Sequence, residues 1–182
     1  MHGQGDAERM TGPGRRTPRG AALVLFAWAM LSPPEPAAAE RVTPSGMPVP
    51  RYVSLKFDTV NARSGPGDDH KLLWVYHARD LPLQVVAETL EWRRVCDPEG
   101  GLGWVHRRTV DGRRTVINLA AGPEPLQSKP KQDASVRAFM RVRAVGALSR
   151  CEKGWCRVRV GGVNGWTRQG RLWGTLDAQQ CR

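Results

Sequence analysis

Short runs of alternating apolar and polar residues, separated by turn residues, make up most of residues 51–118. The run from Tyr52 to Phe57 alternates as an opening strand would. The next segment starts as a short strand at Val60 and becomes a loop rich in Gly, Pro and Asp. Further apolar runs predict strands at Leu72–Leu73, Leu83–Val86 and Trp92–Val95. The pattern predicts an all-β fold of short strands joined by tight turns.

One tetrad of this pattern occurs twice. Trp92-Arg93-Arg94-Val95 is followed by Gly103-Trp104, and Trp155-Cys156-Arg157-Val158 is followed by Gly165-Trp166. The paired tryptophans lie twelve residues apart in the first copy and eleven in the second, with a Gly-rich stretch between them each time. Both copies are typical of a strand, a tight turn and a second strand. The repeat predicts two small modules rather than one larger core.

The first 39 residues are typical of an export signal. Arginines up to Arg19 precede an apolar run from Ala21 to Leu31, and Ala37–Ala39 supplies a small-residue cleavage site. The apolar run has about eleven residues, fewer than the roughly 20 that a transmembrane helix needs. We expect residues 1–39 to be a cleaved signal peptide that sends the chain to the periplasm or outside the cell, without a stable membrane span. An uncleaved anchor is the alternative.

The rest of the chain divides by composition. Residues 119–132 have three prolines in eight positions, which favours an extended spacer. The predicted organisation is a flexible leader at 40–50, a first module at 51–118, a Pro-rich linker at 119–132, a second module at 133–175 and a tail at 176–182.

The order of these motifs resembles the bacterial SH3 domain family. The resemblance rests on Asn61-x-Arg63-Ser64-Gly65-Pro66, Leu72–Leu73, Leu83–Val86, Trp92-x-x-Val95 and Gly103-Trp104-Val105-His106. These motifs span nearly the whole first module. Tandem modules behind a signal peptide, closed by Leu172-Trp173-Gly174, are similar to exported proteobacterial proteins with tandem domains of this family.

The resemblance implies two small SH3-like β-barrels of five or six strands in tandem, whose ligands meet the loops rather than a buried cavity. Residues 133–175 resemble a degenerate second copy. The segment from Trp155 to Trp166 repeats the signature hairpin, but the Asn-x-Arg opening is absent. That departure argues against a ligand-binding role for the second copy.

All four cysteines lie in the part of the chain that we expect to be exported, where disulfides persist. A two-residue turn at Lys153-Gly154 would place Cys151 directly opposite Cys156, with Cα atoms about 4.5 Å apart. We predict a structural disulfide there, which contributes about 2 kcal/mol for so short a loop. For Cys96 and Cys181 the sequence leaves three alternatives open: a bond with each other, bonds with another chain, or free thiols.

Charge limits the class of partner. The chain carries a net charge of +11, and residues 40–182 hold 24 basic and 14 acidic residues. Outside the cytoplasm, this excess favours anionic surfaces such as cell-wall polymers, acidic lipids or phosphorylated sugars. Nucleic acid is not expected as a partner, because no recognition motif accompanies the charge. A generally basic surface without a specific partner is the alternative.

No catalytic constellation is found in the sequence, so we expect a protein that is not an enzyme. His70, His77 and His106 stand far apart, and none is near a Cys or Ser in a catalytic motif. Asp68-Asp69-His70 comes nearest, but its turn-forming neighbours indicate a solvated loop. No metal is expected, because no second close pair of Cys or His residues supports zinc. No cofactor is expected either.

The candidate ligand-binding residues all lie in the first module. Asn61, Arg63 and Asp68 lie in or beside the predicted loop, where they would contact a wall peptide or sugar. The alternative is that they shape the loop through side-chain hydrogen bonds.

A second group of candidates comes from the strand at Leu72–Tyr76. Alternation places Trp74 and Tyr76 on one face with Leu72, and the second module has no such aromatic run. These rings would line a groove beside the loop, where Arg79, Arg93 and His106 would add charge. Packing of both rings into the core is the alternative.

These observations favour an exported, non-enzymatic binding protein that recognises cell-wall peptidoglycan or another envelope component through its first module. The alternative is a periplasmic adaptor that holds an envelope protein and has no affinity for glycans. A charge spread over both modules and the linker would suit that alternative. The fold class does not distinguish between these two functions.

Overall fold

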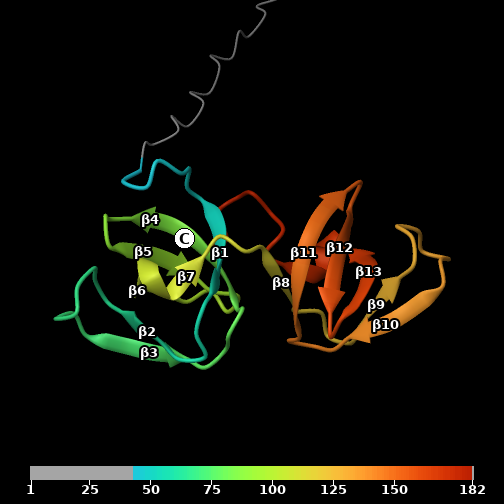
Figure 1. Ribbon diagram of the computed structural model, residues 1–182, viewed down its shortest axis with the longest axis horizontal. Helices are drawn as coiled ribbons and strands as arrows, with labels where there is room; N and C mark the ends of the chain where they lie inside the picture. The colour runs from blue at the N-terminus through green and yellow to red at the C-terminus, as the bar shows by residue number, and fades with distance from the viewer. Residues whose placement is uncertain (1–42, 182) are drawn as a thin grey trace, which may run out of the picture. The chain divides into compact units, whose positions relative to one another are not determined.

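Fourteen strands form two antiparallel sheets of seven in the computed structural model, which describes residues 43–181 (Figure 1). The signal peptide predicted at 1–39 lies outside the described residues. Two short 3-10 turns, η1 (Arg107–Thr109) and η2 (Gln169–Arg171), are the helical segments of the described part. The predicted all-β fold of two small SH3-like barrels in tandem is confirmed.

The first sheet, called the first module from here on, spans residues 51–111 in the order β3-β2-β6-β5-β4-β1-β7. Its strands are β1 (Arg51–Leu55), β2 (Val60–Arg63), β3 (Leu72–Tyr76), β4 (Pro82–Glu88), β5 (Trp92–Cys96), β6 (Leu102–His106) and β7 (Val110–Asp111). Alternation along these strands turns one face of the sheet inward. The core consists of fully buried side chains that include Leu55, Leu83, Val85, Val95 and Val105.

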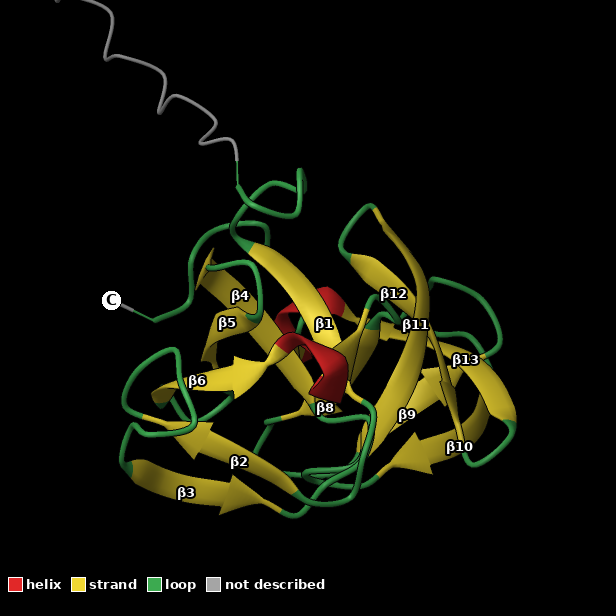
Figure 2. Cartoon of the chain, turned by 60° about the vertical axis from the view of Figure 1, so that its left-hand side comes forward, coloured by secondary structure: helices red, strands yellow, loops and turns green. Residues whose placement is uncertain are grey.

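The second sheet, called the second module, spans residues 115–173 in the order β10-β9-β13-β12-β11-β8-β14. Its strands are β8 (Thr115–Asn118), β9 (Glu124–Gln127), β10 (Val136–Met140), β11 (Val145–Glu152), β12 (Trp155–Val160), β13 (Val163–Arg168) and β14 (Leu172–Trp173). This order is that of the first sheet with every label raised by seven, and Figure 2 shows the second set of strands curving as the first does.

The repetition extends to the irregular positions. A bulge at Leu73 interrupts the pairing of β2 with β3, and a bulge at Arg137 interrupts the pairing of β9 with β10. Asp80 and Arg143, which follow β3 and β10, both adopt left-handed backbone conformations with φ of 63° and 61°. The second module is therefore a complete copy of the first in topology, and the expectation that it is degenerate holds only for its sequence.

The module boundaries differ from those predicted. The Pro-rich segment 119–132 is not a spacer, because it contains β9, which takes the place of β2. Pro125 is tolerated there because β9 pairs with β13 only at Gln127. No hydrogen bond to β13 therefore requires a backbone N–H at Pro125. Residues 115–118 were predicted to belong to the first module, but as β8 they pair with β11 in the second sheet. Only residues 112–114 connect the two sheets.

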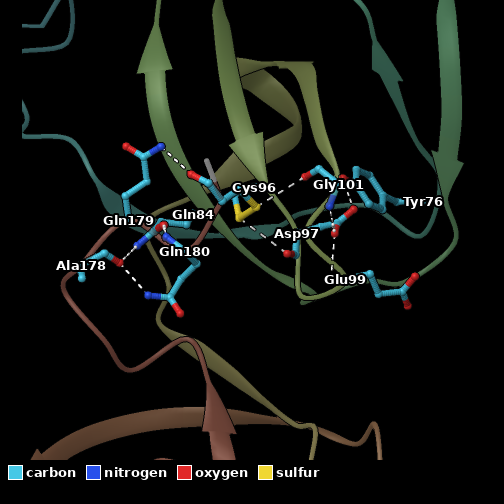
Figure 3. Close-up of a disulfide and its surroundings, with 10 residues drawn as sticks. Tyr76, Gln84, Cys96, Asp97, Glu99, Gly101, Ala178, Gln179 and Gln180 are labelled. Carbon is cyan, nitrogen blue, oxygen red and sulfur yellow. Dashed lines mark hydrogen bonds between the residues drawn. A yellow bond between two sulfur atoms is a disulfide. The ribbon is translucent and has the colours of Figure 1, made fainter.

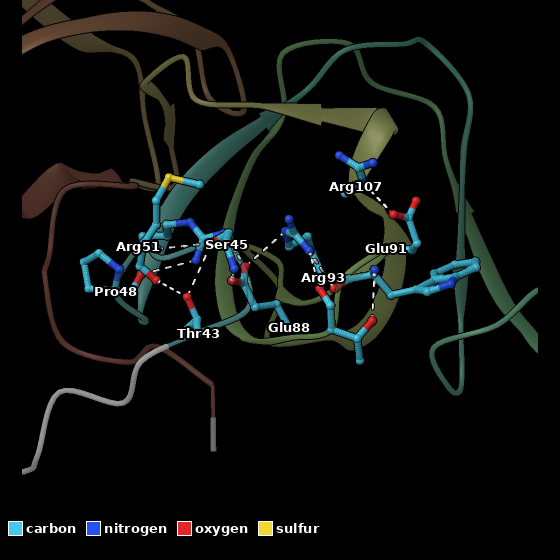
Figure 4. Close-up of polar contacts among 11 residues, drawn as sticks. Thr43, Ser45, Pro48, Arg51, Glu88, Glu91, Arg93 and Arg107 are labelled. Atoms are coloured by element: carbon cyan, nitrogen blue, oxygen red, sulfur yellow. Dashed lines mark hydrogen bonds and ion pairs between the residues drawn. The ribbon is translucent and has the colours of Figure 1, made fainter.

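The segment before β1 forms no strand, but it is not the flexible leader that the sequence predicts. The backbone N–H of Ser45 donates to Oε1 of Glu88 at 2.8 Å, and that of Gly46 donates to the carbonyl of Thr43 at 2.9 Å (Figure 4). A buried carboxylate needs donors around it, and the leader supplies one. Residues 40–42 lie outside the described part of the chain.

The tail crosses back onto the first module (Figure 3). Cys181 forms a disulfide with Cys96, with Cα atoms 5.7 Å apart. The side-chain amide of Gln84 donates to the carbonyl of Ala178 at 2.9 Å and accepts from the N–H of Gln180 at 2.8 Å. The buried Gln84 thus bonds the tail as the backbone of a neighbouring strand would. The pairing of Cys96 and Cys181, which the sequence left open, is with each other.

The disulfide predicted from turn geometry is confirmed. Cys151 and Cys156 face each other across β11 and β12, with Cα atoms 4.0 Å apart. Lys153 and Gly154 both have positive φ, as a two-residue turn of this hairpin type requires.

Candidate functional site

An aromatic groove lies on the first module where β3 passes the loop between β5 and β6. Its volume is 520 Å³, and its lining includes Trp74, Tyr76, Asp97 and Glu99 together with Arg143 of the second module. Trp74 and Tyr76 meet edge to face, with ring centroids 6.0 Å apart. The two rings share one face of β3, as alternation predicts.

Leu72 does not continue this face. The bulge at Leu73 breaks the alternation, so that Leu72 pairs with Arg63 while Trp74 pairs with Ala62. Leu72 and Leu73 are exposed by 44% and 41% on the edge strand.

Tyr76 belongs to the groove and to the core at once. Its side chain is only 8% exposed and packs in the apolar core of the first module. Its hydroxyl donates to Oδ2 of Asp97 at 3.1 Å (Figure 3). Burial and the adjacent Asp97 carboxylate raise the pKa of Tyr76 above its usual range, so the hydroxyl stays protonated. Tyr76 therefore packs in the core, as one alternative expects, and its ring also lines a groove, but that groove lies beside the β5–β6 loop and not beside residues 61–69.

Trp74 lies between the groove and the sheet. A Cβ added at Gly103 would come within 3.3 Å of the ring, so glycine at this position gives the indole room to pack against β6. The indole N–H is buried beside the Tyr76 hydroxyl, without a well-formed hydrogen bond to it. Because protein atoms enclose this N–H, Trp74 can meet a ligand through its ring and not through its donor.

Asp97 gives the groove a fixed wall. Its Oδ1 accepts hydrogen bonds from the backbone N–H groups of Glu99 at 2.9 Å and Gly101 at 2.8 Å. A Cβ at Gly101 would lie 2.6 Å from the Asp97 carboxylate, and Gly100 has φ of +88°, so the turn requires glycine at both positions. The loop is therefore ordered by its own side chain before any ligand arrives.

The charges at the mouth of the groove are not those that the sequence predicts. Glu99 forms an ion pair with Arg143, and both side chains are largely exposed. Arg79, Arg93 and His106, expected to add charge here, do not line the groove.

Asn61 and Arg63 lie apart from the two rings. Asn61 pairs with Val75, so it occupies the opposite face of the β2–β3 pair from Trp74. Its side chain is exposed and makes no hydrogen bond among residues 43–181. Arg63 donates from Nη1 to the carbonyl of His70 at 2.9 Å, and its Nη2 lies 3.7 Å from Oδ1 of the exposed Asp68. These contacts correspond to the loop-shaping alternative for Arg63 and Asp68.

Arg93 is part of a buried ionic cluster (Figure 4). Its Nε lies 3.1 Å from Oε2 of Glu88, and Arg51 contacts the same oxygen. Burial raises the pKa of Glu88, but hydrogen bonds from Ser45 and Arg51 outweigh it and lower the pKa to about 2. Arg93 stands near the start of β5, whereas Asp97 follows its end, so Arg93 does not reach the groove.

His106 closes the end of β6. Its ring meets Trp92 edge to face at 5.3 Å, and its Nδ1 accepts from the N–H of Arg108 at 3.2 Å. Its Nε2 lies 3.5 Å from Glu91, whose pKa the Arg107 guanidinium holds below its usual range. His106 therefore caps η1 rather than lining the aromatic groove.

The sequence thus brings Trp74 and Tyr76 together correctly and misses Asp97, Glu99 and Arg143. The run Asp97-Pro98-Glu99-Gly100-Gly101 marks a turn in the sequence. Its approach to β3 depends on the sheet order, in which β6 and β2 stand between β5 and β3. No local pattern carries that information.

Other kinds of site are not found in the described part of the chain. Within residues 43–181, no group of three or more His, Cys, Asp or Glu side chains is arranged to hold a metal ion. The same residues contain no helix long and apolar enough to cross a membrane.

A family model described as bacterial SH3 domain matches the chain twice, at residues 56–112 and 121–174. The chain belongs to the bacterial SH3 domain family. Each match begins after the first strand of its module and ends near the last, and the second includes β9. The bacterial SH3 domains of this chain are therefore the two sheets described above, and the segment expected to be a linker is part of the second domain.

Two solved structures are similar to the chain at low identity. They are NlpC2 and NlpC1 from Trichomonas vaginalis, at 11% and 12% identity, with TM-scores of 0.33 and 0.32. Each match covers 68% of this chain, which spans less than half of the two structures, at 48% and 45% of their lengths. TM-scores of this size do not establish a shared fold. No curated protein matches the sequence.

Proposed function

We propose that this protein is an exported, non-enzymatic binding protein that recognises peptidoglycan or another cell-envelope component through the aromatic groove of the first module. Bacterial SH3 domains are often cell-wall-binding modules. The observation that carries the proposal is the pair of rings, Trp74 and Tyr76, set against the carboxylates of Asp97 and Glu99 in a groove of 520 Å³.

Peptidoglycan offers chemistry that fits this groove. Its sugars present apolar ring faces and acetamido groups, and its stem peptides carry amino groups. The partly exposed indole of Trp74 gives an apolar ring face a flat surface to pack on. At the mouth, an amino group would compete with Arg143 for the exposed carboxylate of Glu99. A groove of this volume lies in the range of small-ligand sites.

Export to the periplasm or the outside of the cell is part of the proposal. Two disulfides and no free cysteine in the described residues are typical of proteins that fold in an oxidising compartment. The signal peptide expected at residues 1–39 would bring the chain there.

The alternative is an adaptor that holds an envelope protein, and exposed edge strands favour it. β3 and β10 stand at the equivalent edge of the two sheets. Leu73 and Phe139 are exposed by 41% and 62% on these strands. An edge strand with apolar side chains can accept a strand of a partner protein.

Co-sedimentation with purified sacculi over a salt series tests the proposal. We expect saturable binding that persists at about 150 mM salt. Trp74→Ala should weaken it by about tenfold, as the loss of a central aromatic anchor does. Glu99→Gln should weaken it less, and it guards against misfolding because Glu99 is exposed. Leu73→Ala is the matched control, since Leu73 lies on the same strand outside the groove.

Binding that vanishes at modest salt, or that Trp74→Ala and Leu73→Ala weaken equally, would contradict recognition by the groove. If an envelope protein were instead recovered by crosslinking, and Leu73→Ala or Phe139→Ala abolished its recovery, the adaptor would replace wall recognition.

A further inference from the structure

The second module carries the net charge of the chain. Residues 51–111 contain nine basic and nine acidic residues, whereas residues 115–175 contain eleven basic and three acidic residues. The first module is therefore neutral and the second has a net charge of +8, while Arg113 and Arg114 add two charges to the connection. The expectation of a charge spread over both modules is wrong. Anionic ligands are drawn to the second module and to the junction.

A cavity of 620 Å³ opens at this junction. Four arginines line it, Arg79 after β3, Arg113 and Arg114 of the connection, and Arg159 of β12. Among its described lining residues, Asp80 is the single carboxylate. We call this cavity the arginine cleft.

Three of the four guanidinium groups keep their charge uncompensated. Arg113 is neutralised, because its Nη2 lies 3.0 Å from Asp80 and its Nε lies 2.9 Å from Asp111. In residues 43–181, no carboxylate oxygen lies within 4.0 Å of the guanidinium of Arg79, Arg114 or Arg159. An uncompensated cluster of this kind favours a multiply charged anion.

Part of the cleft is held in place by the fold. Arg114 donates from Nη2 to the carbonyl of Gly174 at 3.1 Å, and its guanidinium lies 5.1 Å from the centre of the Tyr52 ring. The small residues Gly146 and Ala147 line the wall beside Arg159. A Cβ at Gly146 would approach within 2.8 Å of the Val160 side chain, so glycine is needed for this close packing.

The first module has no counterpart of this surface, because the tail covers it. Arg159 pairs with Ala147 across β12 and β11 in the register position that Cys96 and Gln84 occupy across β5 and β4. Gln84 and Cys96 are fully buried, bonded to the tail. Arg159 and Ala147 are exposed. The same outer position of the sheet is thus closed in one module and open in the other.

We propose that the arginine cleft binds a phosphate group, either as free phosphate or as the phosphomonoester of a sugar-sized ligand. A phosphomonoester carries close to two negative charges at neutral pH, and guanidinium groups match the geometry of its oxygens. The cleft volume suits a ligand of that size. This site is separate from the aromatic groove and does not depend on wall recognition.

Titrations of the purified protein followed by ¹H–¹⁵N NMR test the proposal. Inorganic phosphate, glucose 1-phosphate, glucose and malonate are compared at constant ionic strength of about 150 mM. We expect saturable shifts confined to residues around the cleft for both phosphates. A lower Kd for glucose 1-phosphate would identify a phosphorylated sugar as the ligand, and equal Kd values would identify phosphate itself.

Arg159→Gln and Arg157→Gln form a matched pair for this experiment. Each removes one charge from the same face of β12, but only Arg159 lines the cleft. Arg159→Gln should weaken phosphate binding by at least about tenfold, and Arg157→Gln by less than about twofold. Arg79→Gln is a second exposed variant, and its weakening would show that both modules contribute.

Three results would overturn the proposal. The first is that neither phosphate gives a saturable shift up to about 20 mM. The affinity would then be weaker than one guanidinium contact supports. The second is equal weakening by Arg157→Gln and Arg159→Gln, which would indicate general charge attraction. The third is malonate binding as tightly as phosphate, because the cleft would then recognise carboxylates.

Discussion

The two modules use different chemistry at the same place in the sheet. Glu88 pairs with Arg93 across the β4–β5 hairpin, and Cys151 pairs with Cys156 across the equivalent β11–β12 hairpin. The first pair is a buried ion pair, 3.1 Å from Nε to Oε2, and the second is a disulfide. One fold position is therefore crosslinked by charge in one copy and by a covalent bond in the other.

The difference teaches which surroundings each crosslink needs. The Glu88 carboxylate is fully buried, and it is stable there because Arg51 and the leader residue Ser45 also bond to it. The Cys151–Cys156 bond needs no such partners, and the second module has no leader of its own. The ionic crosslink should therefore respond to pH, and the covalent one to reducing agents.

A second difference between the modules is the tail, which is bonded to the first module only. Removing its disulfide should have the largest effect on the free energy of unfolding. The double variant Cys96→Ala, Cys181→Ala should lower the free energy of unfolding by about 4 kcal/mol, because the bond joins positions 85 residues apart and so restrains the unfolded chain strongly. Urea denaturation measures the loss. Hydrogen exchange should also quicken at the Gln180 N–H, which bonds to Gln84.

Gln179→Ala is the control for this variant, since Gln179 is an exposed residue of the same tail whose side-chain amide bonds only within the tail, to the carbonyl of Cys181. It should change stability by less than about 0.5 kcal/mol. A loss below about 1 kcal/mol in the double cysteine variant would mean that the Gln84 hydrogen bonds and the packing of the tail already hold the two modules together without the disulfide.

Acid should weaken the first module more than the second. The folded pKa of Glu88 is about 2, below its ordinary value of 4.5, so the unfolded chain binds the extra proton between these values. The stabilisation is complete above pH 5 and is lost as the pH falls toward 2, with a total of about 3 kcal/mol. Unfolding by urea at a series of pH values should show this loss in the native protein and a flatter curve for Glu88→Gln.

Glu152→Gln supplies the comparison for the acid experiment. Glu152 lies at the end of the equivalent hairpin, half exposed and 3.5 Å from Arg150. Exposed pairs contribute little, so its curve should stay parallel to that of the native protein within about 0.5 kcal/mol. If Glu88→Gln also gave a parallel curve, the ionic cluster would not be the source of acid sensitivity.

Local patterns in the sequence predict the fold well, and contacts between distant segments limit the prediction. The alternation, the tryptophan repeat and the Cys151–Cys156 bond all follow from a few neighbouring residues. β9 was missed because proline composition indicates a spacer, whereas Pro125 lies in a part of β9 that makes no ladder pair with β13. The Cys96–Cys181 bond was left open because its partners lie 85 residues apart.

The candidate site was also predicted where its residues are neighbours in sequence and missed where they come from distant segments. Trp74 and Tyr76 were placed together because they lie on one strand with period two. Arg93 was expected to add charge to the groove, yet it lies near the start of β5, whereas Asp97, which lines the groove, follows the end of that strand. Arg143 comes from the other module, and only the assembled chain brings it to Glu99.

Removing the Cys151–Cys156 bond should lower the free energy of unfolding less than removing the Cys96–Cys181 bond or protonating Glu88. The double variant Cys151→Ala, Cys156→Ala should lose about 2 kcal/mol, because the bond closes a loop of only a few residues. The loss should stay local, since the turn at Lys153 and Gly154 sets the register without the bond. Hydrogen exchange should therefore quicken in β11 and β12 and remain unchanged in β4 and β5.

Reducing agent provides the control for this last change. In the Cys96→Ala, Cys181→Ala background, reduction should add the same change in exchange that the Cys151→Ala, Cys156→Ala substitutions cause in the native protein, because one disulfide remains to be broken. Faster exchange in β4 and β5 on reduction would contradict the prediction that the Cys151–Cys156 bond stabilises only the second module. The Glu88–Arg93 pair has no bond to reduce, so the first module could respond only if its stability depended on the covalent crosslink of the second.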